Sequence, residues 1–270
     1  MKGLKLGYLA DTIADLQRGS TTDAGRSLVD LWREDAKIEW LLQAPADARQ
    51  RRTLMIDAIR SRMQALADRI DPSAIARALG AMALVPRERF VCPLIDDFAY
   101  LPMPLAIGLE QTISHPELVA VLAAAADPRG GHVLDVGTGS GYQAAVLGQM
   151  AARVTSVEIL EPHARLAQRR LASLGYGNID VRVGDAVAMG VCTPDTYDAI
   201  VVAAGSSEIP LEFLSALKPG GRLVMPVGPS QDDEQLVLAE RLNATQWRQT
   251  TLRPARFVPL TGKGQRQTAQ

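Results

Sequence analysis

The sequence has little of two features that nucleic-acid binders need. Aromatic residues make up 4% of its 270 residues, and 29 lysines and arginines stand against 30 aspartates and glutamates, for a formal net charge of −1. Proteins that bind nucleic acids typically combine a basic surface with aromatic side chains on which bases stack. We therefore expect no nucleic-acid partner for this chain.

Cysteines and long apolar runs are also scarce. Cys92 and Cys192 are the two cysteines, and their spacing fits neither a disulfide framework nor a set of metal ligands. They predict reduced thiols, a cytoplasmic protein and no metal site. No stretch approaches the ~20 consecutive apolar residues of a transmembrane helix, so we expect no membrane association. The first residues also lack the apolar core and cleavage site of a signal peptide.

What the chain does contain is a glycine-rich stretch, HVLDVGTGSGY at His132–Tyr142. Its apolar start predicts a buried parallel strand, its glycines predict a sharp turn, and Tyr142–Met150 predicts a helix. This order of elements opens a nucleotide-binding α/β sheet. A dinucleotide site needs G-x-G-x-x-G, but Tyr142 occupies the last glycine position of that pattern. The spacing therefore disfavours an NAD-dependent dehydrogenase and is typical of S-adenosylmethionine methyltransferases.

The chain after the glycine-rich stretch alternates strands with helices. Further strands are predicted at 154–157, 179–183, 197–202, 222–227, 235–240 and 247–259, with a helix at 161–174. This alternation predicts an α/β fold with a doubly wound, mostly parallel sheet. The two consecutive strands at the end of the chain predict an antiparallel edge.

Two acidic residues follow predicted strands of this sheet. Glu158 follows the strand at 154–157, where an acid can hydrogen-bond to the ribose hydroxyls of a nucleoside ligand. Asp185 follows the strand at 179–183 and is placed to reach the adenine edge. Taken alone, Asp185 fits a simple turn cap better.

The chain divides into three predicted parts. Residues 1–53 form a helical N-terminal extension, with helical composition at 4–17 and 25–43. Apolar side chains of the extension would pack on the domain, or they would form a substrate lid or a dimer contact. Residues 54–262 form the α/β domain, and 263–270 form a polar tail.

Two helices are expected before the sheet begins. The first, at 47–70, has an apolar stripe made of Ile56, Ile59, Met63, Leu66 and Ile70. The second, at 74–83, is capped by Asp71 or Ser73.

A proline-rich segment, AYLPMPLAIGLEQTISHP at Ala99–Pro116, precedes a predicted helix at 117–126. It is too apolar for a free linker, and a long irregular loop on an α/β core is usually functional. Ser114 is placed to cap the helix, and it can contact a substrate as well. His115 is expected to be an exposed residue at the helix start.

Together these segments resemble the protein-L-isoaspartate O-methyltransferases from about Leu54 to Gly262. The segments that carry the resemblance are VPRERFV at 85–91, IGxxxTISxP at 107–116, VLDVGTGSGYQAAVL at 133–147, VTSVEI at 154–159, LGYGNIDVRVGDA at 174–186, YDAIVVAA at 197–204, LKPGGRLVMPVG at 217–228 and RFVPLTG at 256–262. The glycine-rich stretch is common to many methyltransferases, whereas the TISxP and FVPLTG stretches are far more specific to this family.

The resemblance implies a Rossmann-like class I methyltransferase fold and S-adenosylmethionine as cofactor. It implies that the enzyme methylates the α-carboxyl of L-isoaspartyl residues in a peptide or protein, and the ester then forms a succinimide that can reopen as aspartate. The implied cofactor residues are Thr112, Ile113, Ser114, Asp135, Gly137, Thr138, Gly139, Ser140, Gly141, Glu158, Ile159, Gly184, Asp185 and Ala186. The implied substrate residues are Glu110, Gln111, Ser114, Val258, Pro259 and Leu260. Ser114, beside the transferring methyl, is the implied catalytic residue.

The expected chemistry agrees with the scarcity of candidate bases. A carboxylate acceptor is already ionised at neutral pH because its pKa is about 4. It needs no general base, so the protein has only to align the reacting atoms. A serine hydroxyl such as that of Ser114 can orient the carboxylate without protonating it.

Some positions depart from the family pattern. Pro102 and Ala106 are altered in the segment before TIS, and the triplet Leu109-Glu110-Gln111 replaces one that is commonly rich in glycine or glutamine. A glutamate that faces a carboxylate acceptor would repel it. Either Glu110 points to solvent, or the acceptor is another carboxylate, such as a natural-product precursor peptide or a small acid. A non-catalytic cofactor-binding protein is a further alternative, and the N-terminal helices could support an oligomer.

Overall fold

The structure is a computed structural model that describes residues 44–243 and 245–264. The helices expected at 4–17 and 25–43, and with them the predicted lid or dimer contact, lie outside the described residues. Most of the predicted tail does so too. Contacts divide the chain into Met1–Asp47 and Ala48–Gln270. The boundary predicted between 53 and 54 therefore falls inside a helix of the second unit.

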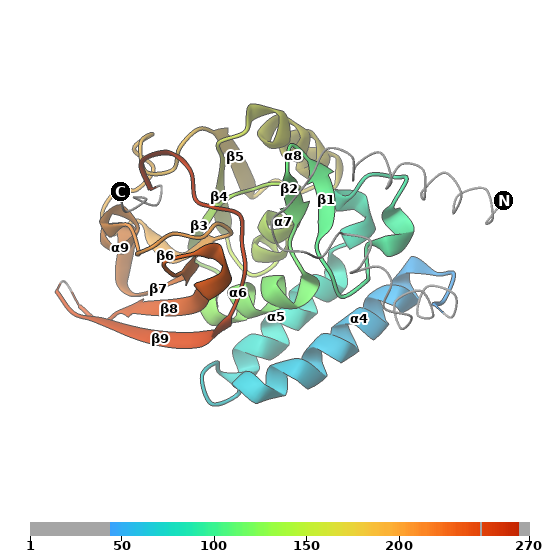
Figure 1. The fold of residues 1–270 in the computed structure, drawn as a ribbon, viewed down its shortest axis with the longest axis horizontal. Coiled ribbons are helices and arrows are strands. Elements are labelled where there is room, and N and C mark those ends of the chain that lie inside the picture. The colour runs from blue at the N-terminus through green and yellow to red at the C-terminus, as the bar shows by residue number, and fades with distance from the viewer. Residues whose placement is uncertain (1–43, 244, 265–270) are drawn as a thin grey trace. The chain divides into compact units, whose positions relative to one another are not determined.

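A seven-stranded sheet with the order β5-β4-β3-β6-β7-β8-β9 forms the centre of the unit that begins at Ala48 (Figure 1). Its strands are β3 (His132–Val136), β4 (Arg153–Glu158), β5 (Ile179–Val183), β6 (Tyr197–Val202), β7 (Leu217–Val227), β8 (Gln235–Arg241) and β9 (Trp247–Pro254). The strands from β5 to β7 pair in parallel, whereas β8 and β9 are antiparallel. The predicted α/β fold and its antiparallel edge are confirmed.

Two of the predicted strands, at 222–227 and 247–259, differ from the structure by several residues at one end each. The strand predicted at 222–227 begins earlier, at Leu217. The strand predicted at 247–259 ends at Pro254, because proline cannot donate to a neighbouring strand. The chain then leaves the sheet and pairs at Pro259 with Gly205, which follows β6.

Helices pack on the sheet and on one another. They are α4 (Ala48–Met63), α5 (Pro72–Leu84), α6 (Pro116–Ala126), α7 (Tyr142–Gly148), α8 (Glu161–Ser173) and α9 (Leu211–Ala216). α6 packs on β6 and β7, α7 packs on β3, β4 and β5, and both α4 and α5 pack on α6. No helix in the described ranges combines the length and apolar character needed to cross a bilayer.

The two helices expected before the sheet are present with different bounds. α4 ends at Met63 and a 3₁₀ turn (Gln64–Leu66) follows, so the helix predicted at 47–70 is too long. All five residues of the predicted stripe are buried nevertheless. Asp71, not Ser73, caps α5, and its carboxylate accepts a hydrogen bond from the Ser73 N–H at 2.9 Å.

The proline-rich segment contains a short hairpin that the sequence analysis missed. β1 (Leu105–Gly108) pairs with β2 (Gln111–Ile113) through a two-residue turn, Leu109-Glu110. Both turn residues have positive φ, 52° and 60°, as a type I′ turn requires. The turn lacks the Asn-Gly or Asp-Gly pair by which such hairpins are recognised, so the segment reads as a loop.

The strand order places the site. β3 lies between β4 and β6. The chain runs from β3 through β4 to β5 on one side, and then crosses to β6 on the other side of β3. In open α/β sheets, ligands bind at such a switch point, outside the carboxyl ends of the strands. The core beneath is closely packed, with Leu134, Ile200 and Leu223 fully buried.

Candidate functional site

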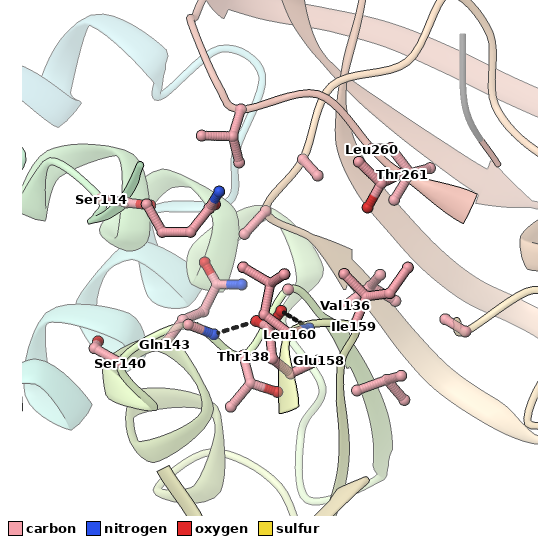
Figure 2. A pocket seen from close by; sticks show the side chains of 18 of the residues that line it. Ser114, Val136, Thr138, Ser140, Gln143, Glu158, Ile159, Leu160, Leu260 and Thr261 are labelled. Carbon is pink, nitrogen blue, oxygen red and sulfur yellow. Dashed lines mark hydrogen bonds between the residues drawn. The ribbon is translucent and has the colours of Figure 1, made fainter. Parts of the chain in front are cut away.

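A cavity, here called the first cavity, lies at the carboxyl ends of the parallel strands (Figure 2). The loops after β3, β4, β5 and β6 contribute Gly137–Ser140, Glu158–Leu160, Gly184–Val187 and Ala203–Ala204, respectively. The β2 strand with Ser114, the start of α7 with Gln143, and the segment 258–261 also line it. Most of the residues predicted to bind a cofactor therefore line one cavity.

Glu158 joins the loops after β3 and β4. It is 7% exposed; its Oε2 accepts a hydrogen bond from the Gly139 N–H at 2.8 Å, and its Oε1 accepts one from Leu160 at 2.9 Å (Figure 2). Gly139 has a φ of 51°, which favours glycine there. Each carboxylate oxygen has a further lone pair. Glu158 can therefore order the glycine-rich loop and still accept from ligand hydroxyls.

Asp185 both caps its turn and lines the cavity. Its Oδ1 accepts from the Val187 N–H at 2.9 Å, as the turn-cap interpretation requires. Its Oδ2 accepts a hydrogen bond from the Lys263 N–H at 2.7 Å, so the C-terminal segment contacts the same side chain. The two interpretations of Asp185 are compatible.

Two predicted cofactor residues do not line the first cavity. Gly141 is the N-cap of α7, with a φ of 89°. Asp135 is fully buried beneath the loop, where it accepts hydrogen bonds from Gln143 Nε2 at 2.8 Å and Ser156 Oγ at 2.6 Å. Burial raises the pKa of Asp135 to about 6, against the opposing effect of those two hydrogen bonds. Both residues support the glycine-rich loop, and their direct contact with a cofactor stays a prediction.

Gln143 lines the cavity although the sequence analysis did not select it. The Gln143 side-chain nitrogen donates a hydrogen bond to Asp135. The Gln143 Oε1 is a buried acceptor with no partner in the described part of the chain. Buried acceptors normally have a donor. Its place in the first turn after the glycine-rich loop is the signal that could have identified it.

A second cavity adjoins the first. It is lined by residues of α6 and its N-terminus and by the segment 253–258, including His115, Glu117 and Arg253. The two cavities share Thr112, Ser114, Ala203 and Val258. Ser114 therefore lies where they meet, which suits the role predicted for it.

The N-cap of α6 is His115, which corrects the cap predicted for Ser114. His115 Nδ1 accepts a hydrogen bond from the Glu117 N–H at 3.1 Å, and Pro116 is the first helical residue. His115 is partly buried, which corrects its expected exposure. Burial lowers the pKa of His115, so the imidazole is neutral at pH 7. Ser114 does not cap the helix, so its hydroxyl is available to a ligand.

Arg87 holds Ser114 in place, and the sequence analysis quoted it only as part of a motif. It is fully buried; its Nη2 donates to the Ser114 carbonyl at 2.8 Å, and its Nε donates to the Ala99 carbonyl at 2.7 Å. Its guanidinium also lies 4.7 Å from the ring centre of Tyr142, at the start of α7. Burial lowers the pKa of Arg87 to about 10, which leaves it charged at neutral pH.

The predicted substrate residues separate into two groups. Glu110 is exposed at the hairpin tip and lines neither cavity, which agrees with the solvent-facing alternative, and its role in substrate binding stays a prediction. Gln111 lines the first cavity.

The segment Val258–Leu260 lines the first cavity, but part of its backbone is already engaged. Gly205 donates its N–H to the Val258 carbonyl at 2.8 Å and accepts from the Leu260 N–H at 2.7 Å. Substrate binding by this segment stays a prediction. It would have to use other backbone groups or the side chains.

Comparisons with known proteins agree on one family. The family model for protein-L-isoaspartate(D-aspartate) O-methyltransferase matches residues 64–265. A protein-L-isoaspartate O-methyltransferase of Rhodopseudomonas palustris is 46% identical over 187 residues, covering 69% of this chain and 85% of the relative. One from Protochlamydia amoebophila is 46% identical over 189 residues, covering 69% and 89%.

Solved structures show the same fold. A structure described as a protein-L-isoaspartate O-methyltransferase has a TM-score of 0.65 at 24% identity and covers 79% of this chain and 67% of its own. One from Plasmodium falciparum, described likewise and in complex with S-adenosyl-L-homocysteine, has a TM-score of 0.61 at 20% identity and covers 76% and 97%. Both likenesses confirm the class I methyltransferase fold.

Proposed function

Because the chain belongs to the protein-L-isoaspartate(D-aspartate) O-methyltransferase family, we propose that it transfers a methyl group from S-adenosylmethionine to the α-carboxylate of L-isoaspartyl residues in peptides or proteins. The observation that carries the proposal is the meeting of two cavities at Ser114. The first cavity suits a nucleoside cofactor, and the second provides a separate place for the acceptor chain.

The hydrogen-bond acceptors that line the first cavity suit S-adenosylmethionine. Glu158 has lone pairs for ribose hydroxyls, and Asp185 lies at the end of the next strand. The unpaired Oε1 of Gln143 suits the ammonium group of the cofactor's amino-acid part. When bound, the cofactor supplies an electrophilic methyl group on a sulfonium sulfur.

The residues around Ser114 have only to bind and orient the acceptor carboxylate. An isoaspartyl carboxylate is ionised at pH 7 because its pKa is about 4, so the site needs no general base. The Ser114 hydroxyl can donate to one carboxylate oxygen and leave the other free to attack in line. Arg87 keeps the Ser114 backbone in position for this. The resulting ester would cyclise and reopen as aspartate, which supports a repair role.

Methyl transfer from labelled S-adenosylmethionine to an isoaspartyl peptide and to its normal aspartyl twin tests the proposal. We expect labelled ester on the isoaspartyl peptide alone. Tight cofactor binding without transfer to either peptide would favour a non-catalytic protein. Transfer to a different carboxylate alone would favour a dedicated acceptor, although the exposure of Glu110 removes the main argument for one.

A cytoplasmic location is part of the same proposal. Cys92 and Cys192 are both free, which supports a reducing compartment. A role of residues 1–53 in an oligomer stays a prediction, because most of that segment lies outside the described residues.

A further inference from the structure

Glu117 connects three distant elements at the second cavity. Its side chain, at the start of α6, is paired through Oε1 with Arg253 of β9 and through Oε2 with Nη1 of Arg62 of α4, the latter at 3.2 Å. Glu117 is 8% exposed and lines the cavity with Arg253, whereas Arg62 is not part of the lining. Burial alone would raise the pKa of Glu117, but Arg253 and then Arg62 outweigh burial and lower it.

The charges of this cluster do not balance. One carboxylate is shared by two guanidinium groups, which leaves one positive charge in excess. The other arginine of the cavity, Arg256, pairs with Asp232 at 3.1 Å, and His115 is neutral at pH 7. The excess positive charge therefore reaches the cavity through Arg253.

Arg253 has donors to spare. A guanidinium carries five N–H donors in a fixed fork, which suits a second carboxylate. In the part of the chain that the structure describes, Glu117 is the side-chain partner of Arg253, and it accepts a hydrogen bond from Nη1. The side chain of Arg253 is 36% exposed, so an incoming peptide can reach it.

We propose that Arg253, with Glu117 as its partial counter-charge, makes the second cavity select isoaspartyl peptides that carry a further carboxylate near the isoaspartyl residue. The inference rests on the proposed function and adds a preference among its substrates. The selecting group acts on binding of the acceptor chain and not on methyl transfer itself.

The experiment compares matched pairs of isoaspartyl peptides. The two peptides of a pair differ only by glutamate or glutamine at one position, which lies one or two residues before or after the isoaspartyl residue. At one position or more, we expect the glutamate peptide to have a KM lower by about two- to fivefold, the range of a partly exposed ion pair. The ratio should shrink as salt is added, because salt screens exposed charges.

Three variants separate the charge effect from a structural one. Arg253→Gln should abolish or invert the KM ratio, because the negative charge of Glu117 at the cavity is then neutralised less completely. Glu117→Gln should increase the ratio, because it frees the whole charge of Arg253. Arg248→Gln is the matched control, since Arg248 lies on the same strand, pairs with Glu240 at 2.7 Å and lines neither cavity. It should leave the ratio unchanged.

The outcomes distinguish the inference from the proposed function. Equal KM values for all glutamate and glutamine pairs overturn the inference alone, as does a preference that survives Arg253→Gln. If Arg253→Gln does not fold, a ratio that fails to rise in Glu117→Gln also overturns it. Absence of turnover on every isoaspartyl peptide overturns the proposed function, and the inference with it.

Discussion

The first cavity is lined largely by loops that follow consecutive strands of one sheet, whereas the second is lined by side chains from elements far apart in the chain. Glu158 reaches Gly139 across 19 positions, but Glu117 reaches Arg62 across 55 and Arg253 across 136. A site built from short connections leaves a motif in the sequence. The long-range contacts of Glu117 leave no such pattern, although the TISxP and FVPLTG stretches also contribute residues to the second cavity, and the two cavities meet at Ser114.

Removal of Arg87 should have the largest effect, because it supports the junction of the two cavities. Arg87→Met leaves two carbonyls, the buried one of Ala99 and the half-buried one of Ser114, without their donor. We expect the free energy of unfolding to fall by about 3 kcal/mol, since an unsatisfied buried group costs about 1–3 kcal/mol. Urea denaturation measures this loss. Arg89→Met, at an exposed position of the same 3₁₀ turn, is the control and should change little.

Removal of Glu158 should damage the first cavity and spare the second. Glu158→Ala deletes acceptors for the ribose, and hydrogen bonds to a charged group are worth about 1.5–3 kcal/mol, so affinity for S-adenosylhomocysteine should fall roughly tenfold to a hundredfold. Calorimetry on the folded variant gives the affinity. The matched control is Glu161→Ala, because Glu161 is exposed at the start of α8 and pairs with Arg165. Unchanged binding in Glu158→Ala would remove Glu158 from the cofactor site.

Removal of the Ser114 hydroxyl should affect the acceptor more than the cofactor. Ser114→Ala should lower turnover of an isoaspartyl peptide by about tenfold, the equivalent of one hydrogen bond, with nearly unchanged S-adenosylhomocysteine affinity. Because His115 and not Ser114 caps α6, stability should also be nearly unchanged. Parent-like turnover would exclude an orienting role. Equal losses of cofactor affinity and turnover would place the hydroxyl in the first cavity only.

Changes at the hairpin tip should have the smallest effects. Glu110→Gly places glycine at a φ of 60° and should stabilise the protein by less than about 1 kcal/mol, because relief of strain is partly offset by backbone entropy. Glu110→Gln keeps the strain and should change neither stability nor the KM of an isoaspartyl peptide. Thermal unfolding and steady-state kinetics measure the two. A lower KM in Glu110→Gln would mean that Glu110 reaches the acceptor after all.

Local sequence patterns were enough to predict the sheet, its antiparallel edge and most residues of the first cavity. Apolar strands, glycine turns and acids at strand ends are local patterns, and a parallel sheet brings the strand ends to one edge. Glu158 and the glycine-rich loop could be located from these patterns alone. Gln143 was missed because its role depends on the buried Asp135 beside it.

The remaining parts of the site depend on contacts between segments that are distant in the chain. The hairpin at Leu105–Ile113 has no glycine at the two central positions of its turn. The N-cap of α6 is His115, because Pro116 begins the helix. The contacts of Arg87 and Glu117 join segments whose order in the chain carries no sign of their proximity. Local propensities act over a few residues, whereas the Glu117 contacts join α6 to α4 and to β9, so they form only when these elements have come together.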